Sequence, residues 1–203
     1  MIQTLRATSF MQYDLILKNV ARHISLDLQE EEYFISILEI EEIPKKGMIL
    51  KEGQLCKYIY FVNSGALRAF YMDPEAKEST VMFAISQWWI TDMACFINEG
   101  PAMLFIEAIE NSCVLRLSKS ELEKLYVRVP KFEKFFRIIM QNAYIREQLR
   151  VIQNLSLTAE ERYTNFLQKY PLISSQVTQK QIASYLGITP EFLSLVRARR
   201  SRS

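Results

Sequence analysis

The sequence predicts an α+β protein in which an antiparallel β-barrel or β-sandwich is flanked by helices. Three observations support this prediction. Apolar residues recur at helical spacing over residues 12–39, short β-rich runs alternate with turn residues over 43–117, and helical spacing returns from residue 120 onward. The hydrophobic fraction of 49% is enough to supply a core for such a fold.

Short strands are expected in the middle of the chain. An apolar run over residues 58–62 is followed by turn residues at 63–65 and by a second apolar run over 66–72. Further runs cover residues 80–85 and 113–117. Strands of this length and spacing are typical of antiparallel barrels and sandwiches.

A long helix is predicted from Pro130 to about Asn154. Its apolar residues alternate at spacings of three and four positions, which is the heptad pattern of a two-stranded coiled coil. The predicted seam consists of Phe135, Ile138, Asn142, Ile145, Leu149 and Ile152. A second apolar face, containing Phe132, Phe136, Ile139 and Ala143, could pack on the β-rich unit. The alternative is one buried helix with two apolar sides.

The segment over residues 178–191 predicts two helices joined by a sharp turn. Thr178 can cap the first helix, and Gly187 can bend the chain without a Cβ atom. Thr189 and Pro190 then suit the start of the second helix. Ala183 is small where the two helices would cross. This is the spacing of a helix-turn-helix, whose second helix can enter a major groove of DNA.

The charge distribution agrees with a nucleic-acid partner. The whole chain has a net charge of +2, whereas residues 190–203 hold four arginines and one acid. That segment therefore carries +3 and the rest of the chain carries −1. A basic tip on a near-neutral body suits a phosphate backbone. The alternative is a helical hairpin that binds protein.

Several other classes of protein are not supported. No apolar run approaches the ~20 residues that cross a bilayer, and the N-terminus lacks the pattern of a signal peptide, so we expect a cytoplasmic protein without membrane contact. Cys56, Cys95 and Cys113 are widely spaced and His23 is the only histidine, so no metal site is expected. No nucleophile–base pair or phosphate-binding loop is visible, which argues against an enzyme.

Taken together, these features resemble the Crp/Fnr superfamily of bacterial regulators. The resemblance covers nearly the whole chain, and residues 182–191 are similar to a divergent branch abundant in Bacteroidetes. It implies a cyclic-nucleotide-binding-like jelly roll, a dimerisation helix and an all-α helix-turn-helix. The wing that usually follows in the family is expected to be incomplete, because at most residues 201–203 remain for it. The corresponding domains would be a sensor over 1–129, a dimerisation helix over 130–155 and a DNA-binding domain over 156–203.

The resemblance also shows where a cyclic-nucleotide site would lie. Members that bind cyclic AMP carry a Glu for the ribose hydroxyl and an Arg for the cyclic phosphate. Here Asp92 stands near the Glu position, and Ala102 occupies the Arg position. Because a buried phosphate without a guanidinium partner is costly, we expect no cyclic-nucleotide cofactor, while another small-molecule effector stays open. The expected degenerate pocket comprises Thr91, Asp92, Ala102 and Met103. The adjacent Trp88 and Trp89 would point to opposite faces, so that one lines this pocket or both serve packing.

DNA contacts are expected from the helix-turn-helix and the arginine run. Groove and phosphate contacts are assigned to Thr178, Lys180, Thr189, Pro190, Glu191, Ser194, Arg197, Arg199 and Arg200. Leu195 stands where related sequences commonly carry an arginine, which is the usual bidentate reader of guanine. Phe192 and Leu195 either meet thymine methyl groups or pack inside.

The leading hypothesis is a sequence-specific, homodimeric transcriptional regulator that binds double-stranded DNA at a palindromic operator. RNA polymerase is a further partner that this role allows. The competing hypothesis is a ligand-sensing or scaffolding jelly roll whose helical C-terminus binds protein. The two hypotheses differ in one geometric requirement. DNA binding requires a dimer that places the second helices of both helix-turn-helix units on one face, about 34 Å apart.

Overall fold

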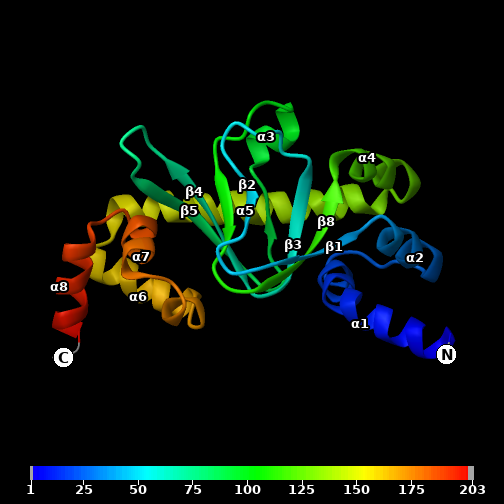
Figure 1. The fold of residues 1–203 in the computed structure, drawn as a ribbon, viewed down its shortest axis with the longest axis horizontal. Helices are drawn as coiled ribbons and strands as arrows, with labels where there is room; N and C mark the ends of the chain where they lie inside the picture. Colours follow the sequence, from blue (N-terminus) through cyan, green and yellow to red (C-terminus); the bar gives the residue numbers. More distant parts are fainter. Residues whose placement is uncertain (1, 201–203) are drawn as a thin grey trace.

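Two antiparallel sheets form the centre of the molecule (Figure 1). The computed structural model describes the backbone of residues 2–200 and the side chains of residues 12–200. One sheet has the order β1-β8-β3-β6 and the other β2-β7-β4-β5. The strands are β1 (Glu39–Ile43), β2 (Met48–Leu50), β3 (Tyr58–Ser64), β4 (Ala66–Met72), β5 (Glu78–Ile85), β6 (Trp89–Ile90), β7 (Phe105–Ala108) and β8 (Ser112–Ser118).

The sheets pack as a β-sandwich around one apolar core. Phe61 of β3 and Val114 of β8 belong to the same buried cluster as Leu67 of β4 and Ile106 of β7. These four residues come from both sheets and are fully buried, so the predicted α+β fold with a central antiparallel sandwich is confirmed. The helical pattern expected up to residue 39 ends earlier, because β1 begins at Glu39 and pairs with β8.

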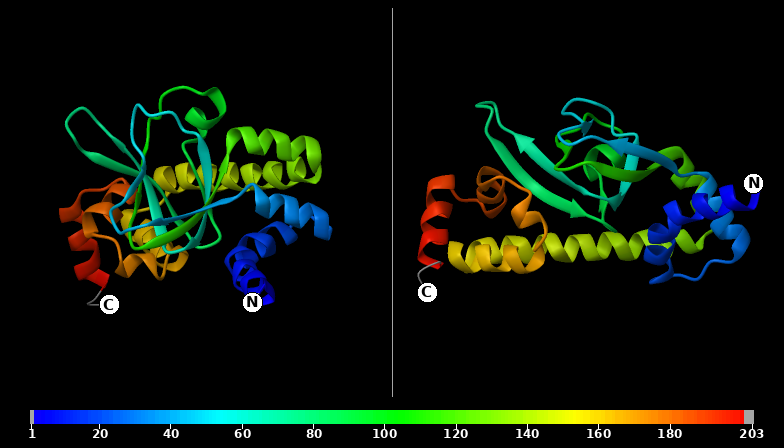
Figure 2. Two further views of the ribbon diagram at one scale, coloured as in Figure 1. Left: turned by 45° about the vertical axis from the view of Figure 1, so that its right-hand side comes forward. Right: turned by 60° about the horizontal axis from the view of Figure 1, so that its bottom comes forward.

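Helices flank the sandwich at both ends. The helices before the C-terminal region are α1 (Ile2–Ala21), α2 (Leu28–Ser36), α3 (Met93–Asn98), α4 (Lys119–Arg128) and α5 (Lys131–Ser156). Figure 2 shows α5 running the length of the molecule, with the N-terminal helices near its start and the C-terminal helices near its end. None of the described helices has the length and apolar character required to span a membrane.

The beginning of α5 is buried, and this corrects one predicted seam residue. Phe132, Phe135 and Phe136 all lie in the core of their own chain. The ring of Phe135 contacts those of His23, Trp89 and Phe132, so the side of the helix that carries Phe135 is covered within its own chain. Phe135 therefore cannot belong to an exposed seam. The prediction that Phe132 and Phe136 face the sandwich is confirmed.

The later part of α5 has a different environment. Ile138 is half-buried, Asn142 is exposed, and Ile145, Leu149 and Ile152 are each 51% exposed. The apolar stripe predicted for this stretch therefore lies on the surface of the single chain. The alternative of one helix buried on both sides is wrong for these turns.

The C-terminal region consists of α6 (Ala159–Lys169), the short 3₁₀ helix η1 (Ile173–Ser175), α7 (Gln179–Leu186) and α8 (Pro190–Arg200). Capping boxes start α6 at Thr158 and α7 at Thr178. Gly187 ends α7 in the left-handed conformation, with φ of 68°. The predicted helix-turn-helix is therefore confirmed. The expectation of an incomplete wing falls on residues 201–203, which lie outside the described residues.

Candidate nucleic-acid interface and effector cavity

The second helix of the motif, α8, has one buried side and one open side. Leu193 and Val196 are buried with Ala183 of α7 in a shared apolar cluster. The Thr189 hydroxyl caps the helix by accepting a hydrogen bond from the Phe192 N–H group at 3.2 Å. Because only every third or fourth residue faces inward, the remaining side of α8 is open to a partner.

The structure places the expected groove residues on this open side. Thr189, Pro190, Glu191 and Ser194 are all exposed. The Ser194 hydroxyl lies 3.3 Å from the side-chain oxygen of Gln179, so the start of α7 lies beside the middle of α8. The expected phosphate contacts Thr178 and Lys180 flank Gln179 and are exposed as well. The two groups of residues therefore share one end of the motif.

The position of two apolar residues on α8 decides between the alternatives for them. Phe192 is 42% exposed and Leu195 is 56% exposed. Neither packs inside, so both are available to a partner of this helix. They add an apolar strip to a surface that is otherwise polar and basic.

The three arginines near the end of α8 are exposed, and two of them contact α6. Arg199 donates to a Glu160 carboxylate oxygen at 3.0 Å, and Arg200 lies 3.5 Å from the Thr164 hydroxyl. An exposed ion pair contributes only about 0–1 kcal/mol, so a DNA phosphate could compete for these guanidinium groups. Arg197 is exposed on the same helix.

The helix-turn-helix is docked on the sandwich by contacts that sequence reasoning missed. The Ser184 hydroxyl of α7 donates to the carbonyl of Glu78 at 2.9 Å and accepts from the N–H of Thr80 at 2.6 Å. Beside it, the buried Arg68 is ion-paired with Glu78 at 2.6 Å and with Glu107. The sequence does contain one signal for this cluster, because Arg68 is a charged residue within the otherwise apolar strand β4.

Aromatic rings complete this docking surface. Phe83 of β5 packs against Phe166 and Tyr170 from the α6 region and against Tyr185 of α7, with ring centroids 5.3–5.9 Å apart. The sandwich and the C-terminal helices therefore share one apolar cluster. Helix α7 is held on strand β5 by these contacts, and α8 packs on α7 through the same cluster. The orientation of α8 therefore depends on how α7 is docked on β5.

The four residues of the expected degenerate pocket lie in different environments. The Asp92 carboxylate is buried and accepts backbone hydrogen bonds from Cys95 at 3.2 Å, Met103 at 2.8 Å and Leu104 at 3.0 Å. Ala102 is buried and pairs with the backbone of the neighbouring 53–54 turn. The Met103 side chain is exposed. The Asp92 carboxylate therefore holds the chain, and the degenerate pocket stays a prediction.

A cavity of about 460 Å³ does lie between β6 and α5, and Thr91 is the one residue of that set that lines it. Its other walls are mostly apolar: Ile59, Met82, Trp88, Trp89, Ile90, Met93, Ile139, Met140 and Ala143. Arg146 is the one cation in the described lining, and its guanidinium lies 4.5 Å from the Trp88 ring centroid. Both tryptophans border this cavity, and Trp89 also donates its indole N–H to Asn19 at 3.2 Å.

The described residues contain no cluster of three or more His, Cys, Asp or Glu side chains that could hold a metal ion. Burial raises the pKa of the Cys56 thiol, and burial together with Glu42 raises that of Cys113 to about 12. These thiols are therefore protonated at neutral pH. Thiol protonation removes the thiolate form that metals prefer.

The comparisons with known proteins agree with this architecture. Residues 40–128 match the cyclic nucleotide-binding domain family. The chain is 24% identical to the fumarate and nitrate reduction regulatory protein of Vibrio cholerae, over 88% of this chain and 76% of that protein. The chain is therefore similar, over most of its length, to a bacterial regulatory protein. It is also 23% identical to the anaerobic regulatory protein of Pasteurella multocida, over 86% of this chain and 68% of that protein.

Solved structures of two bacterial regulators show the same fold as this chain. The c-di-GMP-responsive global regulator CLP of Xanthomonas campestris has a TM-score of 0.70 at 14% identity, over 87% of this chain and 92% of that one. A Crp/Fnr-family regulator of Eubacterium rectale also has a TM-score of 0.70, at 16% identity, over 87% and 85% of the two chains. Similarity to regulatory proteins agrees with the expectation that this chain is not an enzyme.

Proposed function

We propose that this protein is a Crp/Fnr-type transcriptional regulator that binds double-stranded DNA as a homodimer at a palindromic operator, without control by cyclic AMP. The observation that supports DNA recognition best is the open side of α8. Groove candidates (Thr189, Pro190, Glu191 and Ser194) and basic residues (Arg197, Arg199 and Arg200) are exposed there together. Such a helix can place its first turns in a major groove while the basic end contacts phosphates.

The exposed stripe on α5 supports the homodimer. Ile145, Leu149 and Ile152 lie at heptad spacing and would leave apolar surface in water on a single chain. A second copy of the helix would cover that surface, and Asn142 would fix the register of the pair. Two α8 helices about 34 Å apart would then require an operator with twofold symmetry.

Two observations support independence from cyclic AMP. Ala102 provides no cation for a cyclic phosphate, and the Asp92 carboxylate already accepts three backbone hydrogen bonds. The cavity beside α5 is mostly apolar and suits an uncharged or weakly polar effector better than a phosphate diester. Addition of cyclic AMP should therefore leave the melting temperature and the DNA affinity unchanged. A saturable rise in either quantity would contradict this part of the proposal.

Selection of DNA fragments from a random pool by the full chain tests the proposal. We expect enrichment of twofold-symmetric sites, with half-sites one helical turn apart. Binding should weaken steeply between 50 and 200 mM salt because phosphate contacts release counterions. If no fragment is enriched and none is shifted at low salt, the exposed face of α8 is a protein-binding surface instead. Placement in the Bacteroidetes-type branch stays a prediction.

A further inference from the structure

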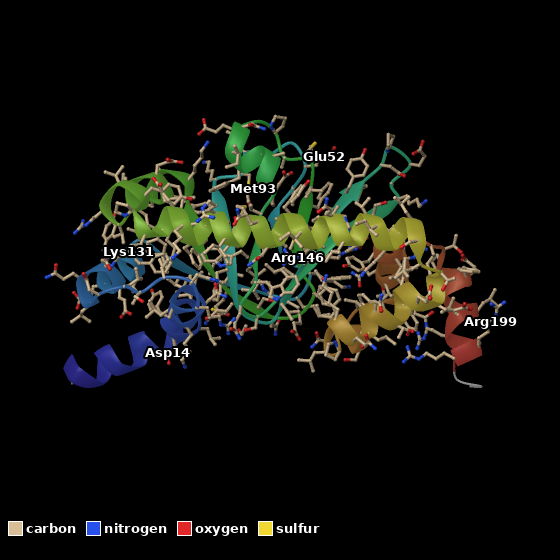
Figure 3. All side chains as sticks on the ribbon, turned by 180° about the vertical axis from the view of Figure 1, so that it is seen from behind. Asp14, Glu52, Met93, Lys131, Arg146 and Arg199 are labelled. Carbon is tan, nitrogen blue, oxygen red and sulfur yellow. The ribbon has the colours of Figure 1, made fainter. Side chains whose placement is uncertain are left out.

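A second cavity lies on the opposite side of Arg146, between α5 and the C-terminal helices. It has a volume of about 590 Å³ and is lined by residues of α5, α6 and α7 together with Tyr170. Figure 3 shows Arg146 on α5 near the middle of the molecule. The cavity is distinct from the one between β6 and α5, although Asn142 and Arg146 line both.

The charges that line this cavity are all of one sign. Arg146, Arg150, Arg162 and Lys169 line it, and the described lining residues include no carboxylate. Arg150 is paired with Glu147 at 2.9 Å, whereas the described residues contain no ion pair for the other three cations. Like charges gathered in one concavity raise the local concentration of anions.

Two details show that these cations are incompletely satisfied. The Nε atom of Arg162 is buried and has no hydrogen-bond partner, while its Nη1 atom donates to the Asn154 carbonyl at 3.0 Å. Burial and the nearby Arg146 lower the pKa of Lys169. A buried donor without an acceptor is costly, and an anion in the cavity would relieve both conditions.

The other walls suit a phosphorylated molecule. Amide side chains of Gln153, Asn154, Asn165 and Gln168 can donate hydrogen bonds to phosphate oxygens. Arg146 and Lys169 lie over the same Trp88 ring, at 4.5 and 5.9 Å from its centroid, so two cations are held close together from different helices. A single phosphate would neutralise only part of this charge.

We propose that this cavity binds a small molecule that carries a diphosphate or triphosphate group. All lining residues of the site belong to one chain, so binding there does not require DNA. Ile145 and Leu149 line it too, so in a dimer the second copy would lie close to the bound anion. Because the cavity joins α5 to α6 and α7, a bound polyphosphate would connect the dimer helix to the DNA-binding helices.

Titration of the full chain with inorganic pyrophosphate at constant ionic strength tests the proposal, with calorimetry and the melting temperature as readouts. We expect saturable binding of one pyrophosphate per chain and a rise in the melting temperature. Arg146→Gln and Lys169→Gln should each weaken binding at least tenfold, and Lys169→Arg should retain it. Arg137→Gln is the matched control, since Arg137 is exposed on α5 outside this cavity and bonds only to Gln141 in the described contacts.

Circular dichroism of each variant separates loss of binding from loss of folding. The proposal is overturned if pyrophosphate does not bind saturably, or if Arg146→Gln and Lys169→Gln bind it as Arg137→Gln does. The proposal is also overturned if the wild-type chain binds no pyrophosphate and the Arg146→Gln and Lys169→Gln variants lose affinity for DNA. In that case the four cations belong to the DNA interface.

Discussion

Phe192 and Leu195 lie three positions apart on α8, and both side chains are open to a partner. Leu195 stands where an arginine would read guanine, so this surface favours apolar contacts in the groove. The thymine methyl group is the apolar feature of the major groove. We therefore expect these two side chains to give α8 a preference for A·T pairs at the positions they reach.

Replacing Phe192 or Leu195 by alanine should reduce discrimination at one base pair of each half-site, by about 1–3 kcal/mol per position. Arg197→Ala is the control, because loss of a phosphate contact should weaken all sequences alike and lower the salt slope by about 1. The measurement is fluorescence anisotropy on single-base variants of the selected operator. Equal loss of affinity on every base variant would show that Phe192 and Leu195 read no base.

The side chain of Tyr126 makes the stability of the fold depend on pH. Burial, followed by Glu123 and Glu133, raises the pKa of the Tyr126 hydroxyl to about 12. Because the unfolded chain releases this proton near pH 10, the stabilisation is complete below pH 10 and is lost as the pH rises toward 12. Tyr126→Phe should therefore reduce the steepness of alkaline unfolding, followed by circular dichroism between pH 9 and 12. An unchanged profile would assign that unfolding to other groups.

At the scale of elements, the first and the later turns of α5 belong to two different surfaces. Its first turns are buried against the sandwich, and its later turns expose Ile145, Leu149 and Ile152. A lysine at the second surface would bring like charges together across a twofold interface. Leu149→Lys and Ile152→Lys should therefore convert a dimer to a monomer in sedimentation experiments.

Val127→Lys provides the control for that prediction, because Val127 on α4 is an exposed apolar residue outside the seam. It should leave the sedimentation coefficient unchanged. A dimer that persists in Leu149→Lys and Ile152→Lys would place the interface elsewhere and remove the basis for the paired α8 helices.

The contact between α7 and β5 depends on Ser184. Ser184→Ala would leave the Thr80 N–H and the Glu78 carbonyl without this partner, at a cost of about 1–3 kcal/mol. For a chain of this size, each kcal/mol lowers the melting temperature by about 2–4 °C. Ser175→Ala should have little effect, because its hydroxyl is exposed and bonds only locally to the Leu172 carbonyl. Equal melting temperatures for the two variants would contradict the role of Ser184.

At the scale of the whole molecule, the sandwich and the helix-turn-helix are joined through one apolar cluster that includes Phe83, Tyr170 and Tyr185. Domains that share a core lose stability together. Differential scanning calorimetry of the full chain should therefore show one cooperative transition. Two well-separated transitions would mean that the C-terminal helices unfold independently of the sandwich.

The sequence alone determined the local features of this protein. The Thr158 and Thr178 caps, the bend at Gly187 and the apolar runs of the strands depend on neighbours within a few positions, which a sequence displays directly. The helix-turn-helix and the long helix could be predicted for this reason. Short strands such as β2, with three residues, were missed because their pairing partners are distant in sequence.

The tertiary structure decided which face of each element is covered. Phe135 has the spacing of a seam residue, but the rings of His23 and Trp89 bury it. Asp92 looked like a ligand-binding acid, but its carboxylate holds the backbone of Met103 and Leu104. Heptad spacing and residue type define what a side chain can do, whereas burial and hydrogen bonding depend on segments brought together from far along the chain.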